Sequence, residues 1–258
     1  MTDMTTRLQN ARRSGPSAVL AFSAAVVLVL SGCATVAPTD TSPSAAYAAG
    51  IADAAVASPR KVSALMPLPQ SGKVSVVSWV TESRTPCKPT DASCAWTTPA
   101  DRIWVTLAGE VQARCRAWGL QGDALRQRLE QLLGLPMDPP VQFRKARFVT
   151  MEVARERLDR PCLGLDESNP QRPVCTIDLQ AGRAPDVRDY VLKQMADSFV
   201  TDNPKGPGYP FTRLGYTYDW NQVNAAPNHY GASEFLVQAS TPASVITQQT
   251  TDAYCAAP

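Results

Sequence analysis

The chain has 258 residues, of which 44% are hydrophobic and 19% are charged, and its formal net charge is +2 at pH 7. This composition is typical of a globular protein and excludes a chain that is disordered throughout or a coiled coil. Residues 1–32 contain three arginines and one aspartate, so 22 basic and 22 acidic residues remain in the rest of the chain. Nucleic-acid binding requires clustered Lys and Arg, which this scattered charge does not provide, so we expect no nucleic-acid partner.

Residues 1–32 have the layout of a secretory signal peptide. Arg7, Arg12 and Arg13 form the positive segment, residues 18–30 form an apolar core, and small residues follow it. The thirteen residues of that core are fewer than the roughly 20 that a transmembrane helix needs. The pattern therefore predicts a cleaved signal and not a permanent membrane span.

The run Leu30-Ser31-Gly32-Cys33 resembles the lipobox of bacterial lipoproteins. In that family the cysteine is acylated and becomes the new N-terminus, so the resemblance implies that Cys33 is lipidated and binds the protein to a membrane. Several acyl chains on one residue give lasting attachment. Residue 34 is Ala, whereas Asp at this place commonly retains such lipoproteins in the inner membrane. The resemblance therefore implies attachment to the outer membrane, facing the periplasm.

Residues 33–72 follow as the lipidated cysteine and a segment rich in Ala, Pro, Ser and Thr. Because such a segment buries little apolar surface to offset its ordering entropy, we expect a disordered, flexible tether. The remaining residues 73–258 are predicted to form one globular domain.

Strands and helices are expected to follow one another irregularly in this domain. β-branched or alternating residues predict strands at 73–80, 102–107, 148–153, 174–179, 215–220 and 231–237. Helical spacing predicts a helix over 110–118 that ends at Gly119, a second from an N-cap at Asp123 to residue 133, and a third over 186–200. Residues 202–208 are expected to be loop, and 245–255 a final strand or short helix. The pattern predicts an α+β fold with a mostly antiparallel sheet and a helical hairpin.

Six cysteines remain once Cys33 is assigned to the lipid, and an even number in an exported chain predicts three disulfides. Sequence does not fix their pairing. The two short loops favour Cys87–Cys94 and Cys162–Cys175, which leaves Cys115 to pair with Cys255. The alternatives are a metal site or a reactive thiol. Because the chain has no Cys-x-x-Cys pair and its single histidine is far from any cysteine, we expect no metal.

Residues 209–235 concentrate aromatic side chains around a few charges, as in pockets that bind flat ligands or sugars. The alternative is that these aromatics belong to a half-buried sheet, where Tyr and Trp are also favoured. The candidate ligand surface consists of Tyr216, Tyr218, Asp219, Trp220, His229 and Glu234.

Catalytic motifs of useful specificity are missing. Asp219 and Glu234 are a candidate pair of glycosidase carboxylates, which Glu110 could join, although a place near a helix N-terminus explains Glu110 as well. His229 lies close to Ser233, but the surrounding sequence is not Gly-x-Ser-x-Gly. The run Ser58-Pro59-Arg60-Lys61 matches Ser-x-x-Lys only formally, because it lacks the companion motifs. No nucleotide or dinucleotide motif is present, and we expect no cofactor.

Two functions are consistent with these features. The first is a lipid-anchored binding or structural module of the bacterial envelope, with an envelope protein or glycan as partner. The second is an envelope glycan or peptidoglycan hydrolase that uses paired carboxylates. Residues 129–136 and 215–220 are also similar to segments of exported bacterial proteins with no assigned activity. That similarity implies only that residues 73–255 fold as one unit.

Overall fold

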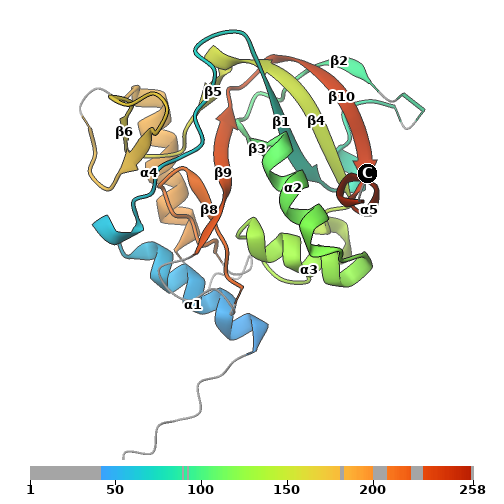
Figure 1. Ribbon diagram of the computed structural model, residues 1–258, viewed down its shortest axis with the longest axis horizontal. Coiled ribbons are helices and arrows are strands. Elements are labelled where there is room, and N and C mark those ends of the chain that lie inside the picture. The colour runs from blue at the N-terminus through green and yellow to red at the C-terminus, as the bar shows by residue number, and fades with distance from the viewer. Residues whose placement is uncertain are drawn as a thin grey trace, which may run out of the picture. The chain divides into compact units, whose positions relative to one another are not determined.

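A computed structural model describes residues 42–88, 90–91, 93–180, 183–199, 208–221 and 229–256 of the chain. Residues 1–32, Cys33 and the first part of the predicted tether lie outside these ranges. Within them the chain forms an antiparallel sheet of eight strands with helices packed on it, so the α+β prediction is confirmed (Figure 1). No helix in the described ranges is long and apolar enough to cross a bilayer.

The sheet has the strand order β2-β10-β4-β1-β3-β9-β5, and β8 pairs with β9 beside this path. A separate two-stranded sheet is formed by β6 and β7. The strands are β1 (Lys73–Val80), β2 (Cys94–Thr97), β3 (Ile103–Leu107), β4 (Arg147–Ala154), β5 (Leu158–Asp159), β6 (Gly164–Asp166), β7 (Val174–Thr176), β8 (Tyr216–Tyr218), β9 (Tyr230–Val237) and β10 (Pro242–Thr250). The helices are α1 (Pro43–Ala55), α2 (Ala108–Trp118), α3 (Gly122–Leu132), α4 (Pro185–Ser198) and α5 (Thr251–Cys255).

The two faces of the sheet bury different sets of side chains because residues alternate along each strand. On one face Val76 of β1 lies opposite Met151 of β4, and both are buried. On the other face Trp79 lies opposite Phe148, and their rings stack at 5.6 Å. Phe148 also stacks on Tyr254 of α5 at 4.1 Å, so this second face carries the helices.

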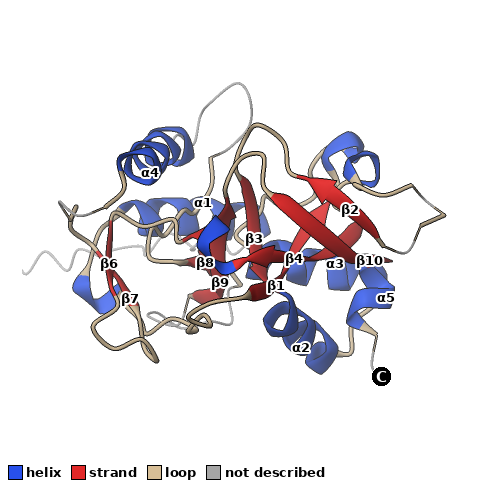
Figure 2. Ribbon diagram, turned by 90° about the horizontal axis from the view of Figure 1, so that it is seen from above, coloured by secondary structure: helices blue, strands red, loops and turns tan. Residues whose placement is uncertain are grey.

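The helices α2, α3 and α5 lie together on that face (Figures 1 and 2). Gly119 ends α2 with a left-handed φ of 62°, which glycine adopts without strain. The N-cap of α3 lies two residues earlier than predicted: Gln121 is the N-cap, and the Asp123 carboxylate accepts instead from Arg126 at 3.1 Å. The hairpin is therefore present, with a shifted start to its second helix.

All three predicted disulfides are confirmed. Two close short loops, Cys87–Cys94 and Cys162–Cys175, with sequence separations of 7 and 13. The third joins Cys115 of α2 to Cys255 of α5 across 140 residues. It fastens the C-terminal helix to the hairpin, where Gln112 Nε2 also donates to the Tyr254 carbonyl at 3.1 Å.

The prediction of a disordered tether up to residue 72 is wrong for residues 43–72. Ser42 caps α1 by accepting from Ala45 N at 3.2 Å, and Pro43 occupies the first turn. Tyr47 and Ile51, one turn apart, are both buried against the strand β8 and Trp220. An alanine-rich composition is typical of disordered segments, but alanine is also the best helix former, and here Tyr47, Ile51 and Ala54 pack the helix against the sheet.

Two further segments differ from the predictions. The strand expected over 174–179 stops at Thr176 and belongs to the small β6–β7 sheet. The C-terminal segment is both a strand and a helix, β10 followed by α5. The loop expected over 202–208 lies outside the described residues except for Gly208.

Candidate ligand pocket

The C-terminal end of α1 is held by two cations from other parts of the chain. Lys61 Nζ bonds the Asp53 carboxylate at 2.9 Å and the Val56 carbonyl at 3.0 Å. Arg213 donates to the carbonyls of Ala54 and Ala55 at 3.2 and 3.1 Å. The last carbonyls of a helix lack intrahelical partners and carry partial negative charge, so cations are favoured there.

Two tyrosines of β8 join the same region. Tyr218 Oη donates to Asp53 Oδ2 at 3.1 Å, and Tyr216 Oη donates to the Lys61 carbonyl at 2.7 Å. Burial raises the pKa of both phenols well above the ordinary tyrosine value, so both remain protonated donors at neutral pH. Their bonds fix α1 and the turn at Pro59–Lys61 against the sheet.

His229 completes this wall. Its ring stacks on Tyr218 with centroids 4.6 Å apart and planes 12° from parallel. Its Nδ1 lies 3.0 Å from the Asp219 carbonyl. A carbonyl oxygen only accepts, so Nδ1 carries the proton in this hydrogen bond.

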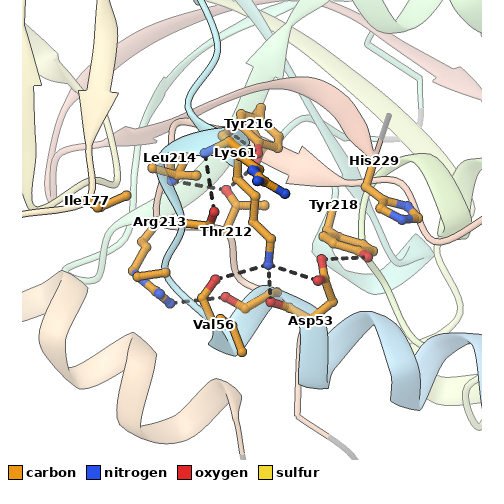
Figure 3. A pocket seen from close by; sticks show the side chains of 14 residues that line it. Asp53, Val56, Lys61, Ile177, Thr212, Arg213, Leu214, Tyr216, Tyr218 and His229 are labelled. Carbon is orange, nitrogen blue, oxygen red and sulfur yellow. Dashed lines mark hydrogen bonds and ion pairs between the residues drawn. The ribbon is translucent and has the colours of Figure 1, made fainter. Parts of the chain in front are cut away.

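A pocket of about 600 Å³ lies between these elements (Figure 3). Its apolar walls include Val56, Ile177 and Leu214, together with Tyr216 and Tyr218. Its charged lining consists of Arg60, Lys61, Arg213 and Asp53. The volume is within the range of about 300–1,000 Å³ that is typical of ligand pockets, and an apolar lining with few polar groups is typical of such sites.

The predicted ligand surface is corrected by this arrangement. Tyr216, Tyr218, His229 and the pocket lie together, but the aromatic residues are buried and do not form an exposed surface. Trp220 is only 2% exposed, donates to the Leu135 carbonyl at 3.0 Å and contacts Tyr47 edge to face at 5.5 Å. The alternative that these aromatics pack in a core is therefore largely right, and only parts of the two tyrosines line a cavity.

The Asp219 carboxylate does not line the pocket and is paired with an arginine of α3. Its two carboxylate oxygens accept from Arg128 of α3 at 3.0 and 2.6 Å, in a bidentate pair that is largely buried. The Arg128 guanidinium also lies over the Trp118 ring at 4.5 Å. Asp219 therefore connects the end of β8 to the helical hairpin.

Glu234 lies far from Asp219 along the sheet. Asp219 N donates to the His229 carbonyl at 3.0 Å, and Glu234 is five residues beyond His229 on β9. Glu234 N also donates to the Gly215 carbonyl, four residues before Asp219, and the β8–β9 register is irregular here, so the two backbone positions lie about 13–16 Å apart at about 3.3 Å per residue. A glycosidase needs two carboxyl groups about 5–9.5 Å apart that face one substrate, whereas the Asp219 carboxylate is bound by Arg128 of α3 and neither residue lines the pocket. The two residues do not converge as a catalytic pair.

One carboxylate oxygen of Glu234 is unpaired within the described part of the chain. Its Oε2 is buried without a hydrogen-bond partner there, and burial raises the pKa of the carboxyl to about 8. Glu110, the third candidate carboxylate, accepts from Ser233 N at 3.0 Å and pairs with Arg114 at 3.3 Å. It satisfies a backbone donor of β9 beyond the end of β3, which is a structural role.

Sequence reasoning missed the charged lining of the pocket. Residues 58–61 were noticed only as a formal Ser-x-x-Lys match, and the geometry confirms that this match is fortuitous. Ser58 Oγ accepts from Arg60 N at 3.3 Å to cap the turn, while Lys61 Nζ points to Asp53. Arg213 gave no local signal, because its partners are residues about 160 positions earlier in the chain.

The chain matches no protein-family model, no curated protein and no solved structure. The geometry defines a disulfide-linked α+β domain with a pocket of ligand size beside α1.

Proposed function

We propose that the protein is a lipid-anchored binding module of the bacterial envelope, and that the pocket between α1 and β8 is its ligand site. The observation that carries this proposal is the pocket itself. Its volume, its apolar walls and its few charged groups are those of a site for a small ligand or for one end of a larger one. An envelope glycan or protein could present such an end.

Two observations support the anchor. The run of residues 30–33 resembles a lipobox and follows an apolar core of the length of a signal peptide. The six other cysteines are all paired, which fits the oxidising compartment that an exported protein enters. With Ala at residue 34, the proposed location is the outer membrane, facing the periplasm.

Hydrolysis is the weaker proposal. Asp219 is bound on both oxygens by Arg128, and the backbone of Glu234 lies about 13–16 Å away along the sheet. Neither residue lines the pocket. No observation therefore favours the paired-carboxylate mechanism over binding.

The anchor is tested by expressing the full-length chain in a bacterium fed an alkyne-labelled fatty acid. We expect the label on the mature protein, in the outer-membrane fraction. The variant Cys33→Ser should carry no label and leave that fraction, whereas Cys87→Ser should keep the label even if it folds less well. An unlabelled wild-type protein that retains its start methionine would contradict the proposal.

Ligand binding is tested by retention of the mature protein on peptidoglycan and on immobilised envelope glycans and proteins. Ala57 is exposed and lines the pocket, so Ala57→Trp should fill it and abolish retention. Ala52 is exposed on α1 outside the pocket, and Ala52→Trp is the matched control that should bind normally. Equal retention of both variants would place binding elsewhere, and release of soluble products would favour the hydrolase.

A further inference from the structure

The charges that line the pocket do not balance. Arg60, Lys61 and Arg213 contribute three positive charges, and Asp53 contributes one negative charge. Lys61 and Asp53 pair at 2.9 Å, which leaves the two arginines. Neither arginine has an ion pair with any carboxylate in the described ranges. The pocket therefore has an excess of positive charge.

Arg213 is the unusual member of this pair because it is buried. Arg213 is only 5% exposed, and its backbone φ of 52° is strained for most residues other than glycine and asparagine. The guanidinium is held by the carbonyls of Ala54 and Ala55 and lies over the Phe199 ring at 5.5 Å. Burial lowers the pKa of this group.

Carbonyls and a ring compensate a buried cation only in part, because a buried charge is stabilised chiefly by an opposite charge. A guanidinium has five N–H donors, and two carbonyl bonds leave further donors available. A bound anion would supply the missing charge. Arg60 is exposed at the rim, where its side chain can contact the same ligand.

The rest of the lining determines what else the ligand must carry. Val56, Ile177 and Leu214 offer apolar surface to its body. Of the two arginines left without a carboxylate partner only Arg213 is buried, so a single negative charge is enough to compensate it, whereas the exposed Arg60 is solvated by water. Arginine matches a carboxylate well because both groups are planar and can form two parallel hydrogen bonds.

We propose that this pocket binds an amphipathic monoanion, with a carboxylate head near Arg60 and Arg213 and an apolar body against Ile177 and Leu214. This inference rests on the proposed function, since it names the chemical class of ligand for the same site. The proposed function requires only that the pocket binds a ligand. This inference adds that the ligand has one negative charge and an apolar body.

The chain provides its own reporter for a test. It contains a single histidine, His229, and that residue lines the pocket. In the full mature protein, produced without a histidine tag, the imidazole resonances belong to one residue and report occupancy directly. We would titrate decanoate, decanol, decylammonium and decyl phosphate, which share one apolar body and differ in the charge of the head.

Decanoate should shift the His229 signals and bind about tenfold more tightly than decanol, as expected for a charged hydrogen bond worth roughly 1.5 kcal/mol. Its advantage should shrink at high salt. Equal affinity for decanoate and decanol, tighter binding of decylammonium, tighter binding of decyl phosphate, or no binding of decanoate would each overturn the proposal.

Arg60→Gln tests the head group without disturbing the interior. It should weaken decanoate about fivefold or more and leave decanol unchanged, as expected for an ion pair at a partly exposed site. Arg172 is an exposed arginine outside the pocket, and Arg172→Gln is the matched control. An equal loss in both variants would show only a long-range charge effect and overturn the assignment.

The result is separable from failure of the proposed function. If an envelope extract shifts His229 and decanoate does not, the pocket is a ligand site and the monoanion class is wrong. If Ala57→Trp retains envelope material as the wild type does, the pocket is not the envelope-binding site, whatever decanoate does.

Discussion

The helical hairpin and the α1 region pack on the sheet in different ways. The hairpin helices α2 and α3 bury evenly spaced side chains, such as Leu125 and Leu129, in the core between the sheet and these helices. α1 buries a few residues in a small separate cluster and is otherwise held by side chains that bond its backbone and its end, such as Arg213 on Ala54. The first region is the scaffold, and the second forms the wall of the pocket.

The contrast teaches that the ligand pocket depends on the less strongly held region. Local stability differs across a protein, and elements with few buried apolar contacts open first. The scaffold should therefore unfold only with the whole domain, whereas α1 should be able to detach alone.

The largest effect should come from opening the disulfide of the scaffold. In the chain-entropy model a bridge across 140 residues stabilises by about 5 kcal/mol, against about 2.5 kcal/mol for one across 7. Cys115→Ala/Cys255→Ala should therefore lose about twice the free energy of unfolding that Cys87→Ala/Cys94→Ala loses. Urea denaturation followed by tryptophan fluorescence measures both. Equal losses would mean that the long bridge does not constrain the unfolded chain.

A smaller effect is expected from Ile51→Ala in α1. Ile51 is fully buried against Tyr218 and Trp220, and such truncations cost about 3 kcal/mol. We expect the loss to appear mainly as faster hydrogen exchange of the amides over residues 43–55, with the sheet amides still protected. Ala52→Ser, on the exposed side of the helix, is the control. Uniform loss of protection across the domain would show that α1 and the scaffold form one cooperative unit.

The smallest effect, counted per unit of pH, concerns Glu234, which lies within the scaffold. Its pKa rises from 4.5 to about 8 on burial. The folded state therefore binds a proton that the unfolded state releases between about pH 4.5 and pH 8. Stability should fall as pH rises through this window, by at most about 1.4 kcal/mol per unit.

Glu234→Gln should remove this slope, because an amide does not titrate. The difference in unfolding free energy between wild type and variant should change by about 1 kcal/mol between about pH 6 and pH 7. Glu156→Gln, at an exposed residue, should show no such change. A wild-type curve that is flat over the window would mean that water or movement solvates the carboxyl.

The scaffold was predictable from sequence because its signals are local. Alternation defined the β1 and β4 strands, helical spacing and Gly119 defined α2, and loop length defined two of the disulfides. The pairing of Cys115 with Cys255 followed by elimination.

The pocket was not predictable for the opposite reason. Tyr216, Tyr218 and His229 were selected for their aromatic character, but only the fold distinguishes them from Trp220, which is buried in a core. Arg213 and Lys61 belong to the site because α1 packs beside them in the folded chain, and the sequence does not show this contact. Composition gave no sign of that docking, since it depends on a few apolar side chains and on hydrogen bonds from residues distant in the sequence.

The docking of α1 also limits how far the domain could work from a bilayer. In the proposed lipoprotein, a fully extended segment from Cys33 to residue 72 could span about 130 Å at roughly 3.3–3.6 Å per residue. Because α1 begins at Pro43, nine residues separate the acylated cysteine from the helix, and this stretch of chain spans at most about 35 Å when fully extended. The ligand of such a protein would have to be met close to the lipid headgroups.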